Sequence, residues 1–223
     1  MISSLIIYIL TKKKVLMNKF KTITIALCMA FASSVAYAEY RIGISAMAVS
    51  VDTSGSETLR DSGNKTNHSI SEDTVVPSLF FEIVEGDTAI GIDYVPVQEM
   101  GSGTGDDDDA ETSGANKAEA EVSGHMSVYL LQEMGSNVFL KAGVVRATIK
   151  TEETLATGDS YGNDTVYGLT AGIGYTMDQG EYFLRGELNY TDYQDVQINS
   201  AGGSTIDASV DSVGAKLSVG RSF

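Results

Sequence analysis

The stretch Val213-Gly-Ala-Lys-Leu-Ser-Val-Gly-Arg-Ser-Phe223 decides the fold of this chain. One set of alternate positions is mostly apolar and reads Val213, Ala215, Leu217, Val219, Arg221 and Phe223. The other set is small or polar and reads Ser212, Gly214, Lys216, Ser218, Gly220 and Ser222. Alternation with period two predicts a β-strand whose two faces meet different surroundings. A strand of about ten residues with an apolar outer face and a polar inner face is typical of transmembrane barrels.

The same alternation recurs along the chain and predicts seven further strands. We expect them at Tyr40–Val51, Thr74–Val84, Thr88–Val97, Glu119–Leu131, Val138–Lys150, Thr165–Met177 and Glu181–Tyr193. Long polar stretches, each predicted to be a loop, alternate with short connections; they are Asp52–Asp73, Glu99–Ala118, Thr151–Asp164 and Gln194–Asp207. The predicted fold is therefore all-β: an eight-stranded antiparallel up-and-down transmembrane β-barrel, with both termini at the end of the short turns.

Two of the predicted strands have a less regular apolar pattern. In Glu119–Leu131 the residues Val122, Met126, Val128 and Leu130 share one parity, which predicts that they face lipid together. In Val138–Lys150 the outward set is predicted to be Val138, Leu140, Ala142 and Val144. Val145, Ala147 and Ile149 on the opposite parity are also apolar, so the parity of this strand stays open.

Seven charged residues fall on the parity that faces the lumen: Arg41, Glu82, Asp93, Lys141, Arg185, Glu187 and Lys216. Both signs occur, and eight strands leave just enough interior room for side chains. We therefore predict that ion pairs fill the lumen, with Glu187 facing Lys216 and Arg41 facing Glu82 across neighbouring strands. The alternative interpretation of these residues is a narrow pore for ions or small solutes.

Outward aromatic residues sort into two bands. Tyr40, Tyr175, Tyr182 and Phe223 fall at the ends with short turns, and Tyr94, Tyr167 and Tyr190 fall near the opposite ends. Aromatic rings are enriched at the level of lipid headgroups, so the two bands predict aromatic girdles. A soluble β-sandwich or lipocalin-like barrel also alternates, but its apolar face points inward. A face rich in Gly, Ser, Thr and opposed charges would be an unusual exterior for such a protein.

The amino-terminal segment has a composition of its own. Five lysines precede Ile23, and no acidic residue occurs before Glu39. An apolar run and the small-residue pattern Ala36-Tyr37-Ala38 follow the lysines, as in a secretory signal peptide. Residues 1–38 are therefore predicted to be a signal peptide that is cleaved before Glu39, with residues 1–16 upstream of a second start at Met17.

Two alternatives to a cleaved signal remain for this segment. An uncleaved membrane anchor would need a longer apolar run. A lipoprotein modified at Cys28 would need a small residue where Leu27 stands, and a longer apolar run before the cysteine.

The segment 39–223 is predicted to be one domain. Five of the 15 basic residues precede Glu39, so the segment has 10 basic against 30 acidic residues and a formal charge of −20. This charge argues against a nucleic-acid partner. Cys28 is the single cysteine, so the segment has no disulfide or thiolate chemistry. No zinc-ligand spacing or phosphate-binding loop occurs, and no cofactor is expected.

The signal peptide, the eight alternating strands and the terminal Ser222-Phe223 resemble the small outer-membrane β-barrel family, which includes the OmpA transmembrane domain, OmpX and the Opa adhesins. The resemblance covers Glu39 to Phe223. Val219, Arg221 and Phe223 resemble the signal read by the barrel-assembly machinery, although Arg221 stands where an apolar or aromatic residue is more usual.

The resemblance implies a monomer in the outer membrane of a Gram-negative cell, in contact with outer-membrane lipid and lipopolysaccharide. It implies a structural or adhesion-like role in surface interaction, with an extracellular ligand bound through loops, and no enzymatic activity. These implications come from the family and not from the periodicity of the chain.

Two short motifs bear on other functions. His125-Met126-Ser127 is faintly similar to the His-x-Ser of outer-membrane lipid A deacylases, but Val128 replaces the usual Asn and no acidic partner is evident. Its parity points into the lumen, so we interpret His125 and Ser127 as an interior polar pair. Asp106 to Asp109 with Glu111 offers carboxylates for Ca²⁺ or Mg²⁺, yet it lacks the alternating spacing of calcium loops. We expect a solvated acidic loop there.

Overall fold

The computed structural model describes residues 22, 38–58, 63, 65–107, 114–154, 160, 162–200 and 205–223. Nearly all of the predicted signal peptide lies outside the described residues. Among the residues that are described, no helix has the length and apolar character needed to cross a membrane. The strands are β1 (Glu39–Thr58), β2 (Lys65–Glu85), β3 (Thr88–Val95), β4 (Gln98–Asp107), β5 (Gly114–Glu133), β6 (Val138–Thr154), β7 (Asp164–Gln179), β8 (Tyr182–Tyr193), β9 (Val196–Asn199) and β10 (Thr205–Ser222).

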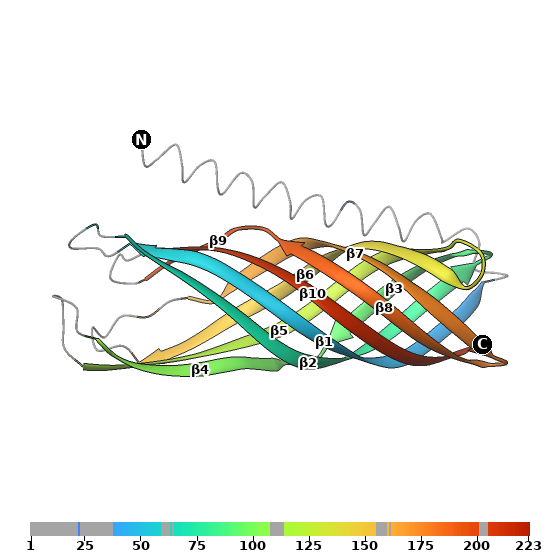
Figure 1. The fold of residues 1–223 in the computed structure, drawn as a ribbon, viewed down its shortest axis with the longest axis horizontal. Coiled ribbons are helices and arrows are strands. Elements are labelled where there is room, and N and C mark those ends of the chain that lie inside the picture. Colours follow the sequence, from blue (N-terminus) through green and yellow to red (C-terminus); the bar gives the residue numbers. More distant parts are fainter. Residues whose placement is uncertain are drawn as a thin grey trace.

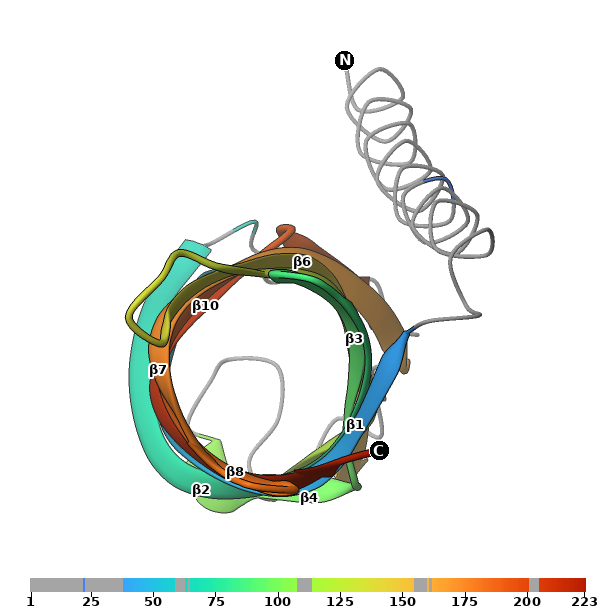
Figure 2. The ribbon, with the colours of Figure 1, turned by 90° about the vertical axis from the view of Figure 1, so that its right-hand side faces the viewer.

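These strands form one closed barrel. β1 pairs with β2 on one side and with β10 on the other, which closes the order β1-β2-β3-β5-β6-β7-β8-β10 (Figure 2). β4 continues β3 along β5, and β9 continues β8 along β10. The break between β3 and β4 falls at Pro96, which has no N–H to donate to a neighbouring strand. All pairings are antiparallel, so the predicted eight-stranded antiparallel barrel is confirmed.

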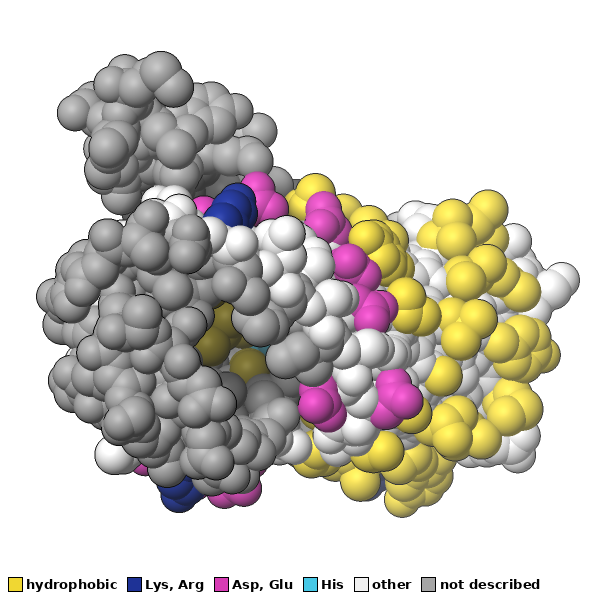
Figure 3. All heavy atoms as spheres, turned by 60° about the vertical axis from the view of Figure 1, so that its left-hand side comes forward, with side chains coloured by type: hydrophobic (Ala, Val, Ile, Leu, Met, Phe, Trp, Pro, Cys, Tyr) yellow, Lys and Arg dark blue, Asp and Glu magenta, His cyan; other side chains and the backbone are white. Residues whose placement is uncertain are grey.

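The two ends of the barrel differ (Figure 1). The turn end carries the short connections and both Glu39 and Phe223; the backbone of Phe223 exchanges hydrogen bonds with Tyr40 there, at 2.8 and 3.2 Å. The opposite end, which we name the outer end, carries the distal parts of the long hairpins. Large hydrophobic side chains cover the outside of the turn-end half, where Leu217 is 65% exposed and Leu188 is 61% exposed. Figure 3 shows this apolar belt. Such an exterior is suited to lipid.

Of the four polar stretches predicted as loops, Asp52–Asp73 and Glu99–Ala118 are strand over most of their length, and the other two are strand in part, so these boundaries were wrong. β1 and β2 stay paired out to Thr58 opposite Lys65, and β4 stays paired with β5 out to Asp107 opposite Gly114. β9 lies within the stretch Gln194–Asp207 and pairs with β10. A transmembrane strand needs about 9–11 residues. β1, β2 and β5, with 20, 21 and 20 residues, therefore extend well beyond the apolar belt.

Where the strands leave the apolar belt, the polarity of the two faces is exchanged, so that the outer face becomes polar and the inner face apolar. In β10 the outward residues change from Val213 to Asp211, while the inward residues change from polar Ser212 to apolar Val210. In β6 the inward residues Val145 and Ala147 are buried, at 1% and 3% exposure. A strand that passes from lipid into water exchanges an apolar outer face for a polar one. This reversal breaks a continuous pattern of period two and explains why the extensions resemble loops in the sequence.

The prediction that Val122 faces lipid with Met126 is wrong. The register between β5 and β6 shifts between Ser123 and Met126, and Gly124 within this bulge has a φ of +56°. Left-handed backbone of this kind suits glycine. The additional residue of a bulge inverts the facing of the strand beyond it, and Val122 consequently lines the interior.

Candidate functional site

The lumen at the level of the apolar belt is crossed by a buried ion pair. Glu82 of β2 is 0% exposed and accepts two hydrogen bonds from Arg185 of β8, from Nη1 at 2.6 Å and from Nη2 at 3.1 Å. The Tyr129 hydroxyl of β5 donates a third, at 2.8 Å to Oε1. These three strands are not neighbours in the barrel, so their side chains meet across the lumen.

Aromatic rings surround the guanidinium of Arg185. Its Cζ lies 5.1 Å from the ring centroids of both Phe139 and Phe183, and 5.7 Å from that of Phe80. Phe139 and Phe183 are 0% and 2% exposed. An added Cβ at Gly174 would come within 2.7 Å of Phe139 Cε1, which shows how closely the ring packs over the neighbouring strand β7. Together Glu82, Arg185, Tyr129 and these rings form a plug, and we keep this name for them.

All seven charged residues predicted for the lumen are buried in the barrel: Arg41, Glu82, Asp93, Lys141, Arg185, Glu187 and Lys216. The partners predicted for them were wrong. Glu187 lies opposite Lys216 in register and Arg41 lies opposite Glu82, but these are not the ion pairs that form.

The observed ion pairs of the lumen do not join residues that lie directly opposite each other on neighbouring strands. Lys141 of β6 pairs with Glu187 of β8 over Gly172 of the intervening β7, where a Cβ would lie 2.8 Å from Glu187 Oε1. Lys216 pairs with Asp93 on the other side of the lumen. Arg41 pairs with Glu39 at 2.8 Å and with Glu133 at 3.1 Å.

Beyond the Asp93–Lys216 pair, toward the outer end, the lumen becomes an apolar chamber of about 330 Å³. Its wall is made of alternate residues contributed by most strands, among them Val49, Val76, Val95, Ile149, Val166 and Val210. The predicted ion-pair network therefore occupies only part of the lumen. The reversed alternation of the outer strands is the sequence signal for this chamber, because it turns Val and Ile side chains inward.

His125 and Tyr193 are the polar pair of the chamber wall. His125 Nε2 lies 3.0 Å from the Tyr193 hydroxyl, and the two rings meet edge to face with centroids 6.5 Å apart. His125 Nδ1 is buried and has no hydrogen-bond partner among the described residues. Neither ring nitrogen is therefore hydrogen-bonded to Ser127, and the interior pair predicted from the sequence is not formed.

The residues predicted for the aromatic girdles lie on the outward parity of their strands. Tyr94, Tyr175, Tyr182, Tyr190 and Phe223 are exposed, and Tyr40 stacks on Phe81 with centroids 6.1 Å apart. Tyr167 is 9% exposed and so is nearly covered.

Arg221, near the end of β10, lies among aromatic rings. Its guanidinium carbon is 4.7 Å from the Phe223 ring centroid and 5.8 Å from that of Tyr182, and its Nη2 pairs with Glu181 at 2.8 Å. Val219, two residues earlier, is outward and exposed. A flat guanidinium that stacks on rings is suited to the boundary between lipid and water.

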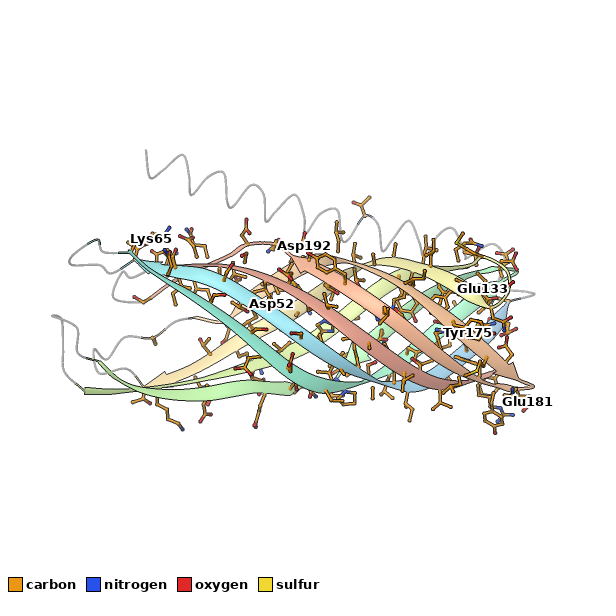
Figure 4. All side chains as sticks on the ribbon, in the orientation of Figure 1. Asp52, Lys65, Glu133, Tyr175, Glu181 and Asp192 are labelled. Atoms are coloured by element: carbon orange, nitrogen blue, oxygen red, sulfur yellow. The ribbon has the colours of Figure 1, made fainter. Side chains whose placement is uncertain are left out.

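A row of acidic side chains marks the limit of the apolar belt. Asp52 of β1, Asp211 of β10 and Asp192 of β8 are direct neighbours in register on the outer surface. Figure 3 shows acidic side chains bordering the hydrophobic ones, and Figure 4 places Asp52 and Asp192. The described residues hold no group of three or more His, Cys, Asp or Glu arranged to bind a metal ion. Of the predicted acidic loop, Asp106 and Asp107 belong to β4, whereas Asp108, Asp109 and Glu111 lie outside the described residues.

Asp211→Asn is expected to stabilise the barrel. Asp211 lies between two other carboxylates, and like charges that face each other across strands are destabilising by about 0.2–1 kcal/mol. Urea unfolding of the protein in zwitterionic lipid vesicles would measure the gain. Because exposed charges are screened by salt, the gain should shrink as NaCl is raised toward about 1 M. A gain that does not depend on salt would contradict the electrostatic explanation.

No family model and no curated protein matches this sequence. Several solved structures are similar in fold. The attachment invasion locus protein Ail of Yersinia pestis, solved with the heparin analogue sucrose octasulfate, is 10% identical with a TM-score of 0.41, over 80% of this chain and 98% of Ail. The outer-membrane protease OmpT of Escherichia coli is 10% identical with a TM-score of 0.47, over 83% and 97%. Neisserial surface protein A is 14% identical with a TM-score of 0.41, over 82% and 97%.

These likenesses are distant, and the architecture of the chain itself is the stronger observation. Eight antiparallel barrel strands close through the pairing of β1 with β10, and an apolar belt surrounds the turn-end half. The chain therefore has the fold of the small outer-membrane β-barrel proteins.

Proposed function

We propose that this protein is a closed surface barrel of the Gram-negative outer membrane, with a structural and surface-interaction role and no through-channel. The observation that carries the proposal is the plug. Glu82, Phe139 and Phe183 are almost without solvent exposure, and Arg185 of β8 reaches Glu82 of β2 across the lumen. Eight-stranded barrels leave interior room only for side chains, and here that room is used.

The outer strands support the interaction role. They carry the wall of the barrel well past the apolar belt, as paired strands whose outward side chains are polar. The outward acidic residues at the boundary include Asp52, Asp73, Asp192 and Asp211, which together we name the acidic rim. A rigid, acidic rim of this kind suits a partner with basic groups, because complementary charge steers association. In this proposal the belt contacts outer-membrane lipid and lipopolysaccharide, and the protein acts as a monomer.

Conductance in planar lipid bilayers tests whether the barrel is closed. The wild type is expected to give no steady current, because the plug crosses the lumen. The variant with both Glu82→Ala and Arg185→Ala removes the ion pair and is expected to leak more than the wild type. If the wild type conducts readily and the double variant merely changes ion selectivity, the closed barrel is wrong and the pore takes its place.

Binding of a lysine-rich peptide tests the acidic rim. Wild-type protein in lipid nanodiscs should bind the peptide with an affinity that falls as salt rises. The variant with Asp52→Asn, Asp192→Asn and Asp211→Asn should bind it more weakly, while the size and packing of the wall stay the same. Equal affinity of the two proteins would remove the basis for a basic partner.

Export and assembly remain predictions. Cleavage before Glu39 would be seen as the mass of the membrane-extracted chain. Recognition by the barrel-assembly machinery would depend on Val219 and Phe223, with Arg221 on the same outward face.

A further inference from the structure

The apolar chamber has the dimensions of a binding site for a small molecule. Its volume is about 330 Å³, at the lower end of the range of about 300–1,000 Å³ for ligand pockets. An apolar cavity of about 150 Å³ holds benzene. The chamber therefore suits a molecule of about twice that size, such as a two-ring aromatic compound.

The chamber is blocked at the end that faces the turn end of the barrel. Figure 3, which brings the outer end forward, shows a hollow with hydrophobic and histidine side chains inside it. The Asp93–Lys216 pair lies toward the turn end, with the plug beyond it. A molecule that enters from the outer end would therefore be held and not passed through.

The chamber wall favours an uncharged ligand. None of its described lining residues is Asp, Glu, Lys or Arg. The charged residues at the turn end of the chamber, Asp93 and Lys216, are already paired with each other. A charged ligand would lose its hydration without gaining a partner, which is costly in an apolar site.

The chamber wall holds a buried polar atom that can orient the ligand. His125 lines the chamber, its Nε2 is engaged by Tyr193, and its buried Nδ1 has no hydrogen-bond partner among the described residues. Nδ1 donates or accepts according to the tautomer of the ring. A hydroxyl on the ligand can satisfy either tautomer, because it both donates and accepts.

We infer that the outer half of the lumen is a binding site for a small, uncharged, mostly apolar molecule that carries one hydroxyl group. The apolar wall holds the body of the molecule, and His125 Nδ1 hydrogen-bonds the hydroxyl. This inference goes beyond the proposed function and requires neither conduction nor a protein partner.

Calorimetric titration of the protein in phosphatidylcholine nanodiscs tests the site, with protein-free nanodiscs as the reference for partitioning into lipid. The probes are 1-naphthol, naphthalene and 1-naphthoate. 1-Naphthol should bind saturably at one site, and naphthalene about tenfold more weakly, since a hydrogen bond contributes about 1 kcal/mol or somewhat more. The 1-naphthoate anion should not bind. Absence of saturable 1-naphthol binding, or equally tight binding of the anion, would overturn the inference.

Two alanines of β10 provide a matched pair of variants. Ala208 lines the chamber, whereas Ala215 is on the lipid-facing side of the same strand. Ala208→Phe places a ring inside the chamber, where it occupies volume that the ligand needs. It should therefore weaken 1-naphthol binding by at least about tenfold. Ala215→Phe adds the same ring outside and should leave the affinity unchanged. Equal affinities in the two variants would place the probe outside the chamber.

A third variant tests the polar contact and covers the case in which Ala208→Phe does not fold. His125→Leu removes the ring nitrogens but keeps an apolar side chain. It should bind 1-naphthol and naphthalene with the same affinity, so that the tenfold preference of the wild type is lost. A preference that survives His125→Leu would contradict the assignment of Nδ1. The conductance measurements above report on the plug alone, so failure here would leave the closed barrel unaffected.

Discussion

Glu82→Ala is expected to destabilise the folded barrel by about 3–5 kcal/mol, the usual effect of leaving one member of a buried ion pair without its partner. Glu82 accepts hydrogen bonds from Nη1 and Nη2 of Arg185 and from the Tyr129 hydroxyl, and all three groups are buried. Without the carboxylate, the Arg185 charge would be enclosed by three phenylalanine rings. Reversible urea unfolding in lipid vesicles would measure the change in the free energy of unfolding.

Two comparisons make this result specific. Adding Arg185→Ala to Glu82→Ala removes the stranded charge and should recover part of the loss, since the two residues are coupled. Glu181→Ala breaks the exposed pair with Arg221 and should change the stability by only about 0–1 kcal/mol. If Glu82→Ala costs no more than Glu181→Ala, the plug is not a dry ion pair and the closed barrel loses its main support.

Leu217→Arg is expected to cost about 2–4 kcal/mol, the effect of a cation on the lipid face near the bilayer midplane. Leu217 is 65% exposed on the outside of β10, midway between Val213 and Phe223. In water such exposure would make Leu→Arg nearly neutral. The loss in the free energy of unfolding therefore reports whether this face contacts lipid. Urea unfolding in vesicles would measure that loss.

Ser209→Arg is the matched control for depth. Ser209 is on the same strand and the same outward parity, but it is exposed beyond the apolar belt. Its hydroxyl lies 2.9 Å from that of Ser54, and exposed hydrogen bonds of this kind contribute little. The substitution should therefore cost at most about 1 kcal/mol, as near a membrane interface. Equal costs at the two positions would show that the apolar belt is not at the depth assigned to it.

The fold and the facing of its residues in the belt follow from local pattern. In β10, Leu217 and Lys216 fall on opposite faces because side chains alternate along any strand. Lipid outside the barrel favours apolar residues on the outer face, and the confined lumen favours polar or small residues on the inner face. The number of strands, their antiparallel order and the burial of all seven lumen charges could therefore be predicted before any contact was known.

The partners of the charges and the length of the strands were decided by the closed barrel. Glu82 meets Arg185 because closure places β2 across the lumen from β8, a relation that no spacing along the chain encodes. Lys141 reaches Glu187 because Gly172 leaves the space between them empty. The bulge at Gly124 reverses the facing of Val122 through one additional residue on β5.

The chamber is likewise a product of tertiary structure. Val49, Ile149 and Val210 face inward next to stretches in which the apolar residues face outward, so a rule that places every apolar residue in lipid misplaces them. Only the closed barrel shows that each of these strands continues past the apolar belt, from the part that faces lipid into the part that faces water. Sequence alone determined the alternation, because it depends on the backbone of one strand. Tertiary structure decided what lies on either side of that strand, because the surroundings depend on all eight strands together.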